Sequence, residues 1–202
     1  NLRTGKLQDF NRADFITKQS KVSWDPAAKC PRFIQFLEEI FVRDKDINGF
    51  IRRVIGYILT GDVTEQVLIF FFGTGRNGKT TLVEIILALL GEFGIQAAPE
   101  ILSLRKGEVH PTEQADLCGV RLAAAQEVKE GTSWDERAVK ALTGGDRIRA
   151  RKMRQDFFEF SPTHKFIVCA NHKPVVKGVD EGIWRRIKMV PFKATIPREK
   201  CD

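Results

Sequence analysis

Hydrophobic positions change their spacing about a third of the way along the chain. Residues 30–41 and 44–62 carry apolar side chains three or four positions apart, which predicts two amphipathic helices that pair as a small bundle. Pro31 suits the first turn of the first helix, and Asp46 suits the N-terminal cap of the second. Residues 1–24 are polar and weakly periodic, so we expect an irregular leader there.

After residue 63 the apolar residues occur in short continuous runs instead. The first run, 66–73, is bounded by a turn signal, and two more, 120–127 and 165–171, end in polar residues. All three are typical of strands buried on both faces of a sheet. Residues 133–145 predict a helix closed by glycines, and residues 146–161 predict a β-hairpin. Strands that alternate with helices predict an α/β fold, in which a sheet core is flanked by helices.

Composition narrows the class of protein. The chain has 202 residues, of which 43% are hydrophobic and 29% charged, as in a globular domain with a real core. Its net charge of +7 favours a polyanionic partner such as nucleic acid. No apolar run reaches about 18 residues, so no membrane span is expected. The four cysteines form no CxxC pair, which favours reduced thiols in the cytosol over a zinc site.

A glycine-rich motif follows the first apolar run. It fits the pattern G-x-x-x-x-G-K-[ST] between a predicted strand and a predicted helix, and so predicts a site for ATP and Mg²⁺. Glycines let backbone N–H groups turn toward phosphates, Lys79 can reach the outer phosphates, and the Thr80 hydroxyl can ligate Mg²⁺. The alternative is a glycine-rich turn that binds nothing. The candidate cofactor-binding residues of the motif are Gly73, Thr74, Gly75, Arg76, Asn77, Gly78, Lys79, Thr80 and Thr81.

Candidate catalytic residues follow the later runs. Hydrolysis of ATP needs an acid near the metal and the attacking water, and Glu127 ends the second run, with Glu130 as a second candidate. Asn171 ends the third run and could orient water, although it could also start an Asx turn. One of Arg185 and Arg186 could stabilise transition-state charge from within the subunit or from a neighbour, unless both are surface arginines.

The predicted hairpin is strongly basic. Its first half carries five cations in ten residues: Arg147, Arg149, Arg151, Lys152 and Arg154. In an extended strand the three arginines at alternate positions share one face, about 6.6 Å apart, which is close to the phosphate spacing of an extended single strand. The row could therefore track a nucleic-acid backbone without reading sequence. The alternative is a solvated charged edge that prevents aggregation.

The order of these motifs resembles one family. "GTGRNGKTT", "LTGGDRIRAR", "CANHKP" and "WRRI" follow one another as in the superfamily 3 helicases of viruses and mobile elements. The resemblance is strongest to the helicase half of phage, plasmid and poxvirus primase-helicases, and it covers roughly residues 30–195. It implies a P-loop NTPase core of the AAA+-like type. The implied domains are a leader with a small helical domain, 1–62, and a C-terminally truncated ATPase domain, 63–202.

The resemblance also implies roles for individual residues. Lys79 and Thr80 match the family's phosphate and magnesium residues, Glu127 its Walker B acid and metal ligand, and Asn171 its sensor. Arg185 matches the arginine finger, with Arg186 as the competitor. Many viral relatives carry two adjacent acids where this chain has Gln126 and Glu127. The residue that activates water, Glu127 or Glu130, therefore stays open.

Two further roles follow from the same resemblance. Lys140 matches a basic residue that approaches a neighbouring subunit's nucleotide. Lys152 and Arg154, with Arg149 and Arg151 on the strand, match the hairpin that grips single-stranded DNA in the channel of a ring.

The function implied is an ATP-dependent DNA helicase that translocates on single-stranded DNA as a homo-oligomeric ring, expected to be a hexamer. The chain is then a piece of a longer polypeptide, and a primase domain could lie elsewhere on it. The expected location is cytoplasmic, in a bacterial host cell or a viral replication compartment. Two alternatives stay open: an ATP-dependent module that binds or loads DNA without unwinding it, and a P-loop kinase that acts on small molecules.

Overall fold

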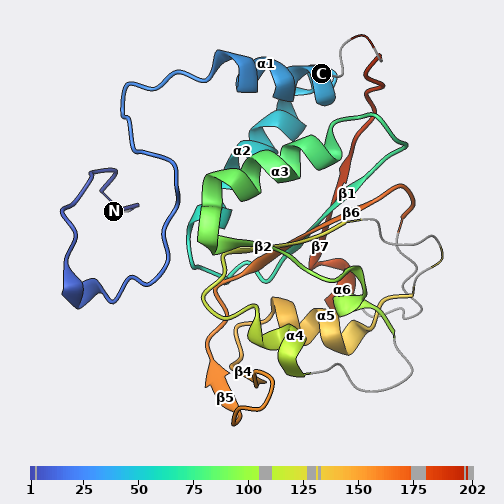
Figure 1. The fold of residues 1–202 in the computed structure, drawn as a ribbon. Coiled ribbons are helices and arrows are strands. Elements are labelled where there is room, and N and C mark those ends of the chain that lie inside the picture. The colour runs from blue at the N-terminus through green and yellow to red at the C-terminus, as the bar shows by residue number, and fades with distance from the viewer. Residues whose placement is uncertain are drawn as a thin grey trace.

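The core is a five-stranded parallel sheet with the strand order β2-β3-β6-β1-β7. The computed structural model describes residues 1–2, 4–104, 111–126, 131, 133–173, 181–197 and 199 (Figure 1). The strands are β1 (Leu68–Phe72), β2 (Gly94–Gln96), β3 (Leu122–Ala125), β6 (Lys165–Ala170) and β7 (Ile187–Pro191). The three predicted strands are confirmed as β1, β3 and β6.

Apart from Lys165 at the start of β6, the three central strands are apolar, because both faces of the sheet are covered. Along β1, Leu68 and Phe70 pack into one hydrophobic cluster, whereas Ile69 and Phe71 pack into the other. One face of the sheet is covered by α1 (Pro31–Ile40), α2 (Lys45–Leu59) and α3 (Lys79–Leu90) (Figure 1). The buried apolar residues of these helices join the cluster that contains Ile69 and Phe71.

The other face carries shorter helices and a hairpin (Figure 1). The elements are α4 (Pro111–Ala115), α5 (Glu136–Thr143), α6 (Glu181–Trp184) and the antiparallel pair β4 (Ile148–Ala150) and β5 (Phe158–Phe160). Trp134 joins this layer to the sheet, because its ring packs edge-on against Phe70 of β1, with 5.4 Å between the ring centroids. The short 3₁₀ turns are η1 (Arg12–Asp14), η2 (Gly91–Phe93) and η3 (Pro99–Leu102).

The two predicted N-terminal helices are present, but the cap of the second was assigned to the wrong residue. Asp44, not Asp46, is the N-cap of α2, because its carboxylate accepts hydrogen bonds from the backbone N–H groups of Asp46 at 3.0 Å and Ile47 at 3.1 Å. Asp46 therefore lies in the first turn, where its charge still complements the helix dipole. The proposed boundary between residues 62 and 63 stays a prediction.

The leader is irregular apart from η1, and residues 18–20 contact the body. The Ser20 hydroxyl donates to Leu89 O at 2.6 Å, and the backbone N–H of Gln19 donates to the Glu92 carboxylate at 2.8 Å. Both acceptors lie at or just beyond the last turn of α3. Residues on either side of this contact are exposed, among them Phe10 and Phe15.

Candidate functional site: a glycine-rich loop and a basic hairpin

The glycine-rich loop, residues 73–78, joins the carboxyl end of β1 to the first residue of α3. Two of its glycines are required by geometry. Gly78 has φ +83°, and a Cβ there would lie 2.6 Å from Cγ2 of Ile40 on α1. Gly73 has φ +149°, and a Cβ there would meet the backbone oxygen of Phe192. Helix α1 and the segment after β7 therefore pack directly against the loop.

The buried side chain of Asn77 ties the glycine-rich loop to the segment that follows β7. Its Nδ2 donates to Thr74 O and, at 3.4 Å, to Phe192 O. A backbone bond from Ile196 N to Arg76 O, 2.8 Å long, supports the loop from the same C-terminal segment. The Asn77 amide therefore supports the loop, and the contact with a cofactor predicted for this residue stays a prediction. The residues that stay exposed are Thr74, Gly75, Arg76, Thr80 and Thr81.

Lys79 is a buried cation surrounded by oxygen atoms that carry no formal charge. Its Nζ donates to Gly73 O at 2.5 Å, to Asn77 Oδ1 at 3.1 Å and to Asn171 Oδ1 at 3.5 Å. Burial removes water from the ammonium group and lowers the pKa of Lys79. Among the described residues no carboxylate pairs with Lys79, and the partners they offer its Nζ are uncharged oxygen atoms.

The strand order brings Asn171 to this lysine. Because β6 lies directly beside β1 in parallel register, the residue after β6 ends at the same edge of the sheet as the glycine-rich loop. The structure thus brings together Lys79 and Asn171, and the catalytic roles predicted for them stay predictions. Glu127 and Glu130 lie outside the described residues. Gln126, which precedes them, donates to Glu84 of α3 at 3.1 Å.

Arg185 and Arg186, which follow α6, lie at the edge where the strands begin, opposite the edge that carries the glycine-rich loop. The backbone N–H of Leu68, the first residue of β1, donates to Arg186 O at 2.8 Å. The length of β1, about 13 Å, separates this edge from the glycine-rich loop. The structure therefore does not bring Arg185 or Arg186 to the loop of their own chain.

The pair also divides by environment. Arg186 is half-buried, and its Nη1 donates to Oγ1 of Thr143 on α5 at 3.2 Å. Arg185 is exposed, and only its backbone N–H, which donates to Glu181 O, has a described partner. Lys140, one turn before Thr143, is partly buried on the same helix.

The hairpin has the predicted form. Arg149 is exposed between the buried residues Ile148 and Ala150, so the alternate arginines share the outer face. Arg147 lies 3.7 Å from the Glu159 carboxylate, an ion pair between exposed side chains. The cations beyond the strand pair, Lys152 and Arg154, are exposed at the tip.

Phe157 is a residue of this hairpin that sequence reasoning missed. The guanidinium groups of Arg149 and Arg151 lie over its ring, 4.5 and 5.1 Å from the centroid. Such cation–π contacts stabilise a side chain at exposed sites by about 0.5–1 kcal/mol. An aromatic residue after a basic strand was the available signal, but its pairing across the turn depends on the three-dimensional path of the hairpin.

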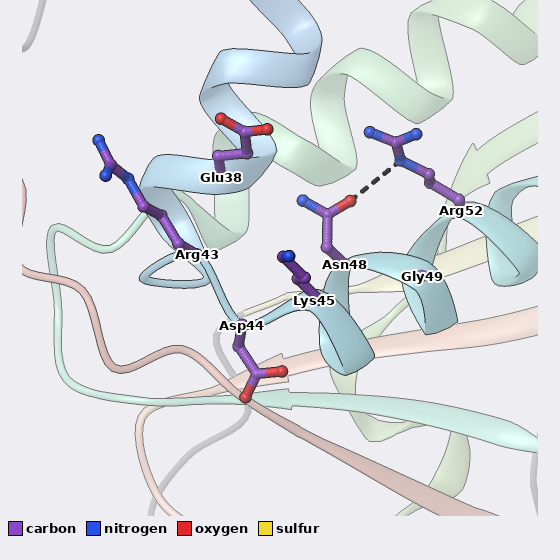
Figure 2. Close-up of a pocket in the computed structure, with 7 residues that line it drawn as sticks. All are labelled: Glu38, Arg43, Asp44, Lys45, Asn48, Gly49 and Arg52. Atoms are coloured by element: carbon purple, nitrogen blue, oxygen red, sulfur yellow. Dashed lines mark hydrogen bonds between the residues drawn. The ribbon is translucent and has the colours of Figure 1, made fainter.

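A separate pocket of about 440 Å³ lies between α1 and α2 (Figure 2). Its lining mixes both signs of charge, and an internal hydrogen bond of 3.0 Å joins Arg52 Nε to Asn48 Oδ1. No residue of the glycine-rich loop lines it, and we assign it no ligand. Its lining residues are Glu38, Arg43, Asp44, Lys45, Asn48, Gly49 and Arg52.

Within the described part of the chain, no group of three or more His, Cys, Asp or Glu side chains could hold a metal ion. No described helix has both the length and the hydrophobicity of a membrane-spanning segment.

Fold and site together define an α/β protein with a buried lysine at a strand–loop–helix junction. The chain belongs to the family of unknown function DUF5906, whose model matches residues 71–186. Residues 1–42 match a second model, described as D5 N terminal like.

Curated relatives are viral. The chain is 30% identical over 151 residues to a protein named "Putative helicase" of Acanthamoeba polyphaga mimivirus, covering 74% of this chain and 16% of that protein. It is 30% identical over 171 residues to a "Putative helicase" of Frog virus 3, covering 81% and 17%. A "Putative primase" of African swine fever virus is 22% identical over 129 residues, covering 61% and 13%. The chain thus spans about a sixth of the first relatives it matches.

Among solved structures, the apo NrS-1 C terminal region has the same fold. The TM-score is 0.66 at 16% identity, and the match covers 88% of this chain and 42% of that one.

Proposed function

We propose that this chain is the ATP-driven motor of a superfamily 3 helicase, within a replication protein of a virus or mobile element. The observation that carries the proposal is Lys79, a buried cation that joins the glycine-rich loop to Asn171 at the end of the neighbouring strand. The names of the viral relatives support a role in DNA replication.

The residues of the loop fit a triphosphate. Lys79 has no acid to neutralise it among the described residues, and the loop is braced beneath but open above. A phosphate group would bring negative charge to Lys79, and the N-terminus of α3 would add positive potential. Lys79 would then exchange its present acceptors for phosphate oxygens, which would free Asn171 Oδ1 to orient water.

Magnesium would be held by Thr80, the second residue of α3, which is exposed. When bound, the ion supplies charge stabilisation for the outer phosphates. We also propose Glu127 or Glu130 as the acid that activates water, on the basis of their position after β3.

The position of Arg185 favours an active site shared between subunits. It lies at the edge of the sheet opposite the loop and has no described side-chain partner, whereas Arg186 is held by Thr143. A glycine-rich loop near Arg185 would therefore have to come from a neighbouring copy of the chain. A ring, which we propose to be a hexamer, provides that arrangement, and Lys140 lies on α5, the helix whose Thr143 accepts from Arg186.

The hairpin would contact single-stranded DNA. Because Glu159 pairs with Arg147, the cations available for phosphates are Arg149, Arg151, Lys152 and Arg154. Hydrolysis at the loop would move the hairpin along the strand.

The decisive experiment measures ATPase rate with and without single-stranded DNA for the parent, Lys79→Ala and Arg185→Ala. We expect stimulation by DNA in the parent and loss of turnover in each variant. A mixture of the two variants should recover part of the rate, because some interfaces then combine one intact loop with one intact Arg185. An ATPase rate that does not change when single-stranded DNA is added would favour a small-molecule kinase and contradict the proposal.

A strand-displacement assay distinguishes a helicase from a module that loads DNA without unwinding it. An ATPase that binds DNA but separates no strands would be a loading module. In that assay, replacing Lys152 and Arg154 with alanine should abolish unwinding, and unwinding that survives would disprove the role of the hairpin.

A further inference from the structure

One carboxylate oxygen at the carboxyl edge of the sheet receives two side-chain amides. Oε1 of Glu84, on α3, accepts from Nε2 of Gln96 at 3.0 Å and from Nε2 of Gln126 at 3.1 Å. Gln96 is the last residue of β2, and Gln126 follows β3 directly. Two strand ends therefore converge on one side chain of the helix that begins with Lys79.

Glu84 shares a helix face with Thr80. The two residues are four positions apart on α3, so their Cβ atoms are about 5–6 Å apart, and both are exposed. The buried positions of α3, Lys79, Leu82 and Val83, face the sheet instead. Glu84 thus lies one turn beyond the hydroxyl that would ligate Mg²⁺, on the side where β2 and β3 end.

The two amides fix this carboxylate without neutralising it. An exposed glutamate ordinarily samples several rotamers, but hydrogen bonds from two different strands select one. Both amides use Oε1, and Oε2 has no partner among the described residues. The result is an oriented negative charge on the helix face that carries Thr80, one turn away.

We propose that Glu84 is a positioning residue for Mg²⁺, which it holds through water molecules of the ion's shell. The inference rests on the proposed nucleotide site. A carboxylate near a triphosphate is unfavourable by itself and becomes favourable when a divalent cation lies between them. The charge of Glu84 should therefore oppose nucleotide binding without magnesium and support it with magnesium.

The competing role is structural, since Glu84 also ties α3 to β2 and β3. Glu84→Gln separates the two roles, because glutamine keeps the size of the side chain and an oxygen that can accept from Gln96 and Gln126. If Glu84 were purely structural, the substitution would change nucleotide affinity equally with and without magnesium. If Glu84 acts on the ion, the substitution changes affinity mainly when magnesium is present.

The test is equilibrium binding of a fluorescent ADP analogue in excess EDTA and in saturating Mg²⁺, with melting temperatures recorded in parallel. In the parent, Mg²⁺ should tighten binding. In Glu84→Gln this gain should fall about tenfold, as for other residues that orient a metal's shell, while affinity in EDTA stays equal or improves. Glu38→Gln, an exposed glutamate on α1, is the matched control and should keep the full gain.

Charge exchange provides the rescue. Combining Glu84→Gln with Gln126→Glu keeps one carboxylate and one amide at the same contact and should restore part of the gain. An unchanged gain in Glu84→Gln, or equal weakening with and without Mg²⁺, would overturn the assignment while the nucleotide site stands. If the parent binds no nucleotide in either condition, the proposed function fails and the role of Glu84 fails with it.

Discussion

Nζ of Lys79 lies 3.5 Å from Oδ1 of Asn171, which links the first residue of α3 to the residue that follows β6. This contact makes the asparagine sensitive to whatever Lys79 binds. We expect Asn171→Ala to lower the ATPase kcat by about 10²-fold, the scale for losing one oriented amide in an active site, and to leave the Kd for nucleotide within about threefold. Lys79→Ala should instead abolish nucleotide binding. Equal loss of binding in both variants would contradict separate roles.

The contrast between Arg185 and Arg186 predicts two different phenotypes. Arg186→Ala removes the hydrogen bond to Thr143 and should lower the free energy of unfolding by about 1–2 kcal/mol, seen as a lower urea midpoint. Arg185→Ala should leave the midpoint unchanged, because its side chain is exposed, and should abolish ATP turnover. If Arg186→Ala kept its stability but lost ATP turnover, and Arg185→Ala remained active, the roles of the two arginines would be reversed.

Two glycines of the same loop provide a matched pair. Gly78→Ala forces an alanine into φ +83° with its Cβ against Ile40, so we expect a loss of about 1–3 kcal/mol in unfolding free energy and weaker nucleotide binding. Gly75→Ala adds a methyl group where no atom lies within 4 Å, and it should leave stability within about 0.5 kcal/mol. Chemical denaturation of the two variants measures the difference, and similar stability would show that α1 does not constrain the loop.

The central elements were predictable because each has a strong local signal. The continuous apolar runs predicted β1, β3 and β6, and the motif around Lys79 predicted the loop. Strands β2 and β7 were missed. β2 has only three residues, and β7 lies at the sheet edge with Lys188 and Pro191 in it, so neither has the composition of a buried strand.

The candidate site was predictable as a set of residues but not as an arrangement. Sequence placed Lys79 at the start of a helix after one strand and Asn171 at the end of another, and their contact follows once β6 is known to lie beside β1. The positions of Arg185 and Glu84 depend on which edge of the sheet each element reaches, which no local pattern records. Those two residues are where the structure changed the interpretation most.

The hairpin predicts a quantitative salt dependence. Replacing Lys152 and Arg154 with alanine removes two phosphate-reaching cations, which should reduce the slope of log Kobs for single-stranded DNA against log salt by about 1.4. Phe157→Ala keeps every cation but frees Arg149 and Arg151, so it should weaken binding with little change in slope. Fluorescence anisotropy at several salt concentrations distinguishes the two. Identical slopes for the tip variant and the parent would place DNA elsewhere.

His164 predicts the response of the fold to acid. Its ring is buried, Nε2 lies 3.0 Å from Leu142 O, and Nδ1 has no hydrogen-bond partner among the described residues. Burial lowers the pKa of His164 from 6.5 to about 4, an effect that the Leu142 carbonyl opposes and the charge of Lys165 reinforces. The native state therefore holds this ring neutral at pH values where the unfolded chain protonates it.

The sign follows from proton counts. Between about pH 6.5 and 4 the unfolded chain binds the proton and the native state does not, so stability is lost as pH falls through this window. At pH 4.5 the loss attributable to His164 should be about 2–3 kcal/mol relative to pH 7. Urea unfolding at both pH values should show a smaller decline in His164→Gln than in the parent. His172→Gln, at an exposed histidine, is the control and should decline as the parent does. Equal declines in the parent and His164→Gln would show that another group governs the acid response.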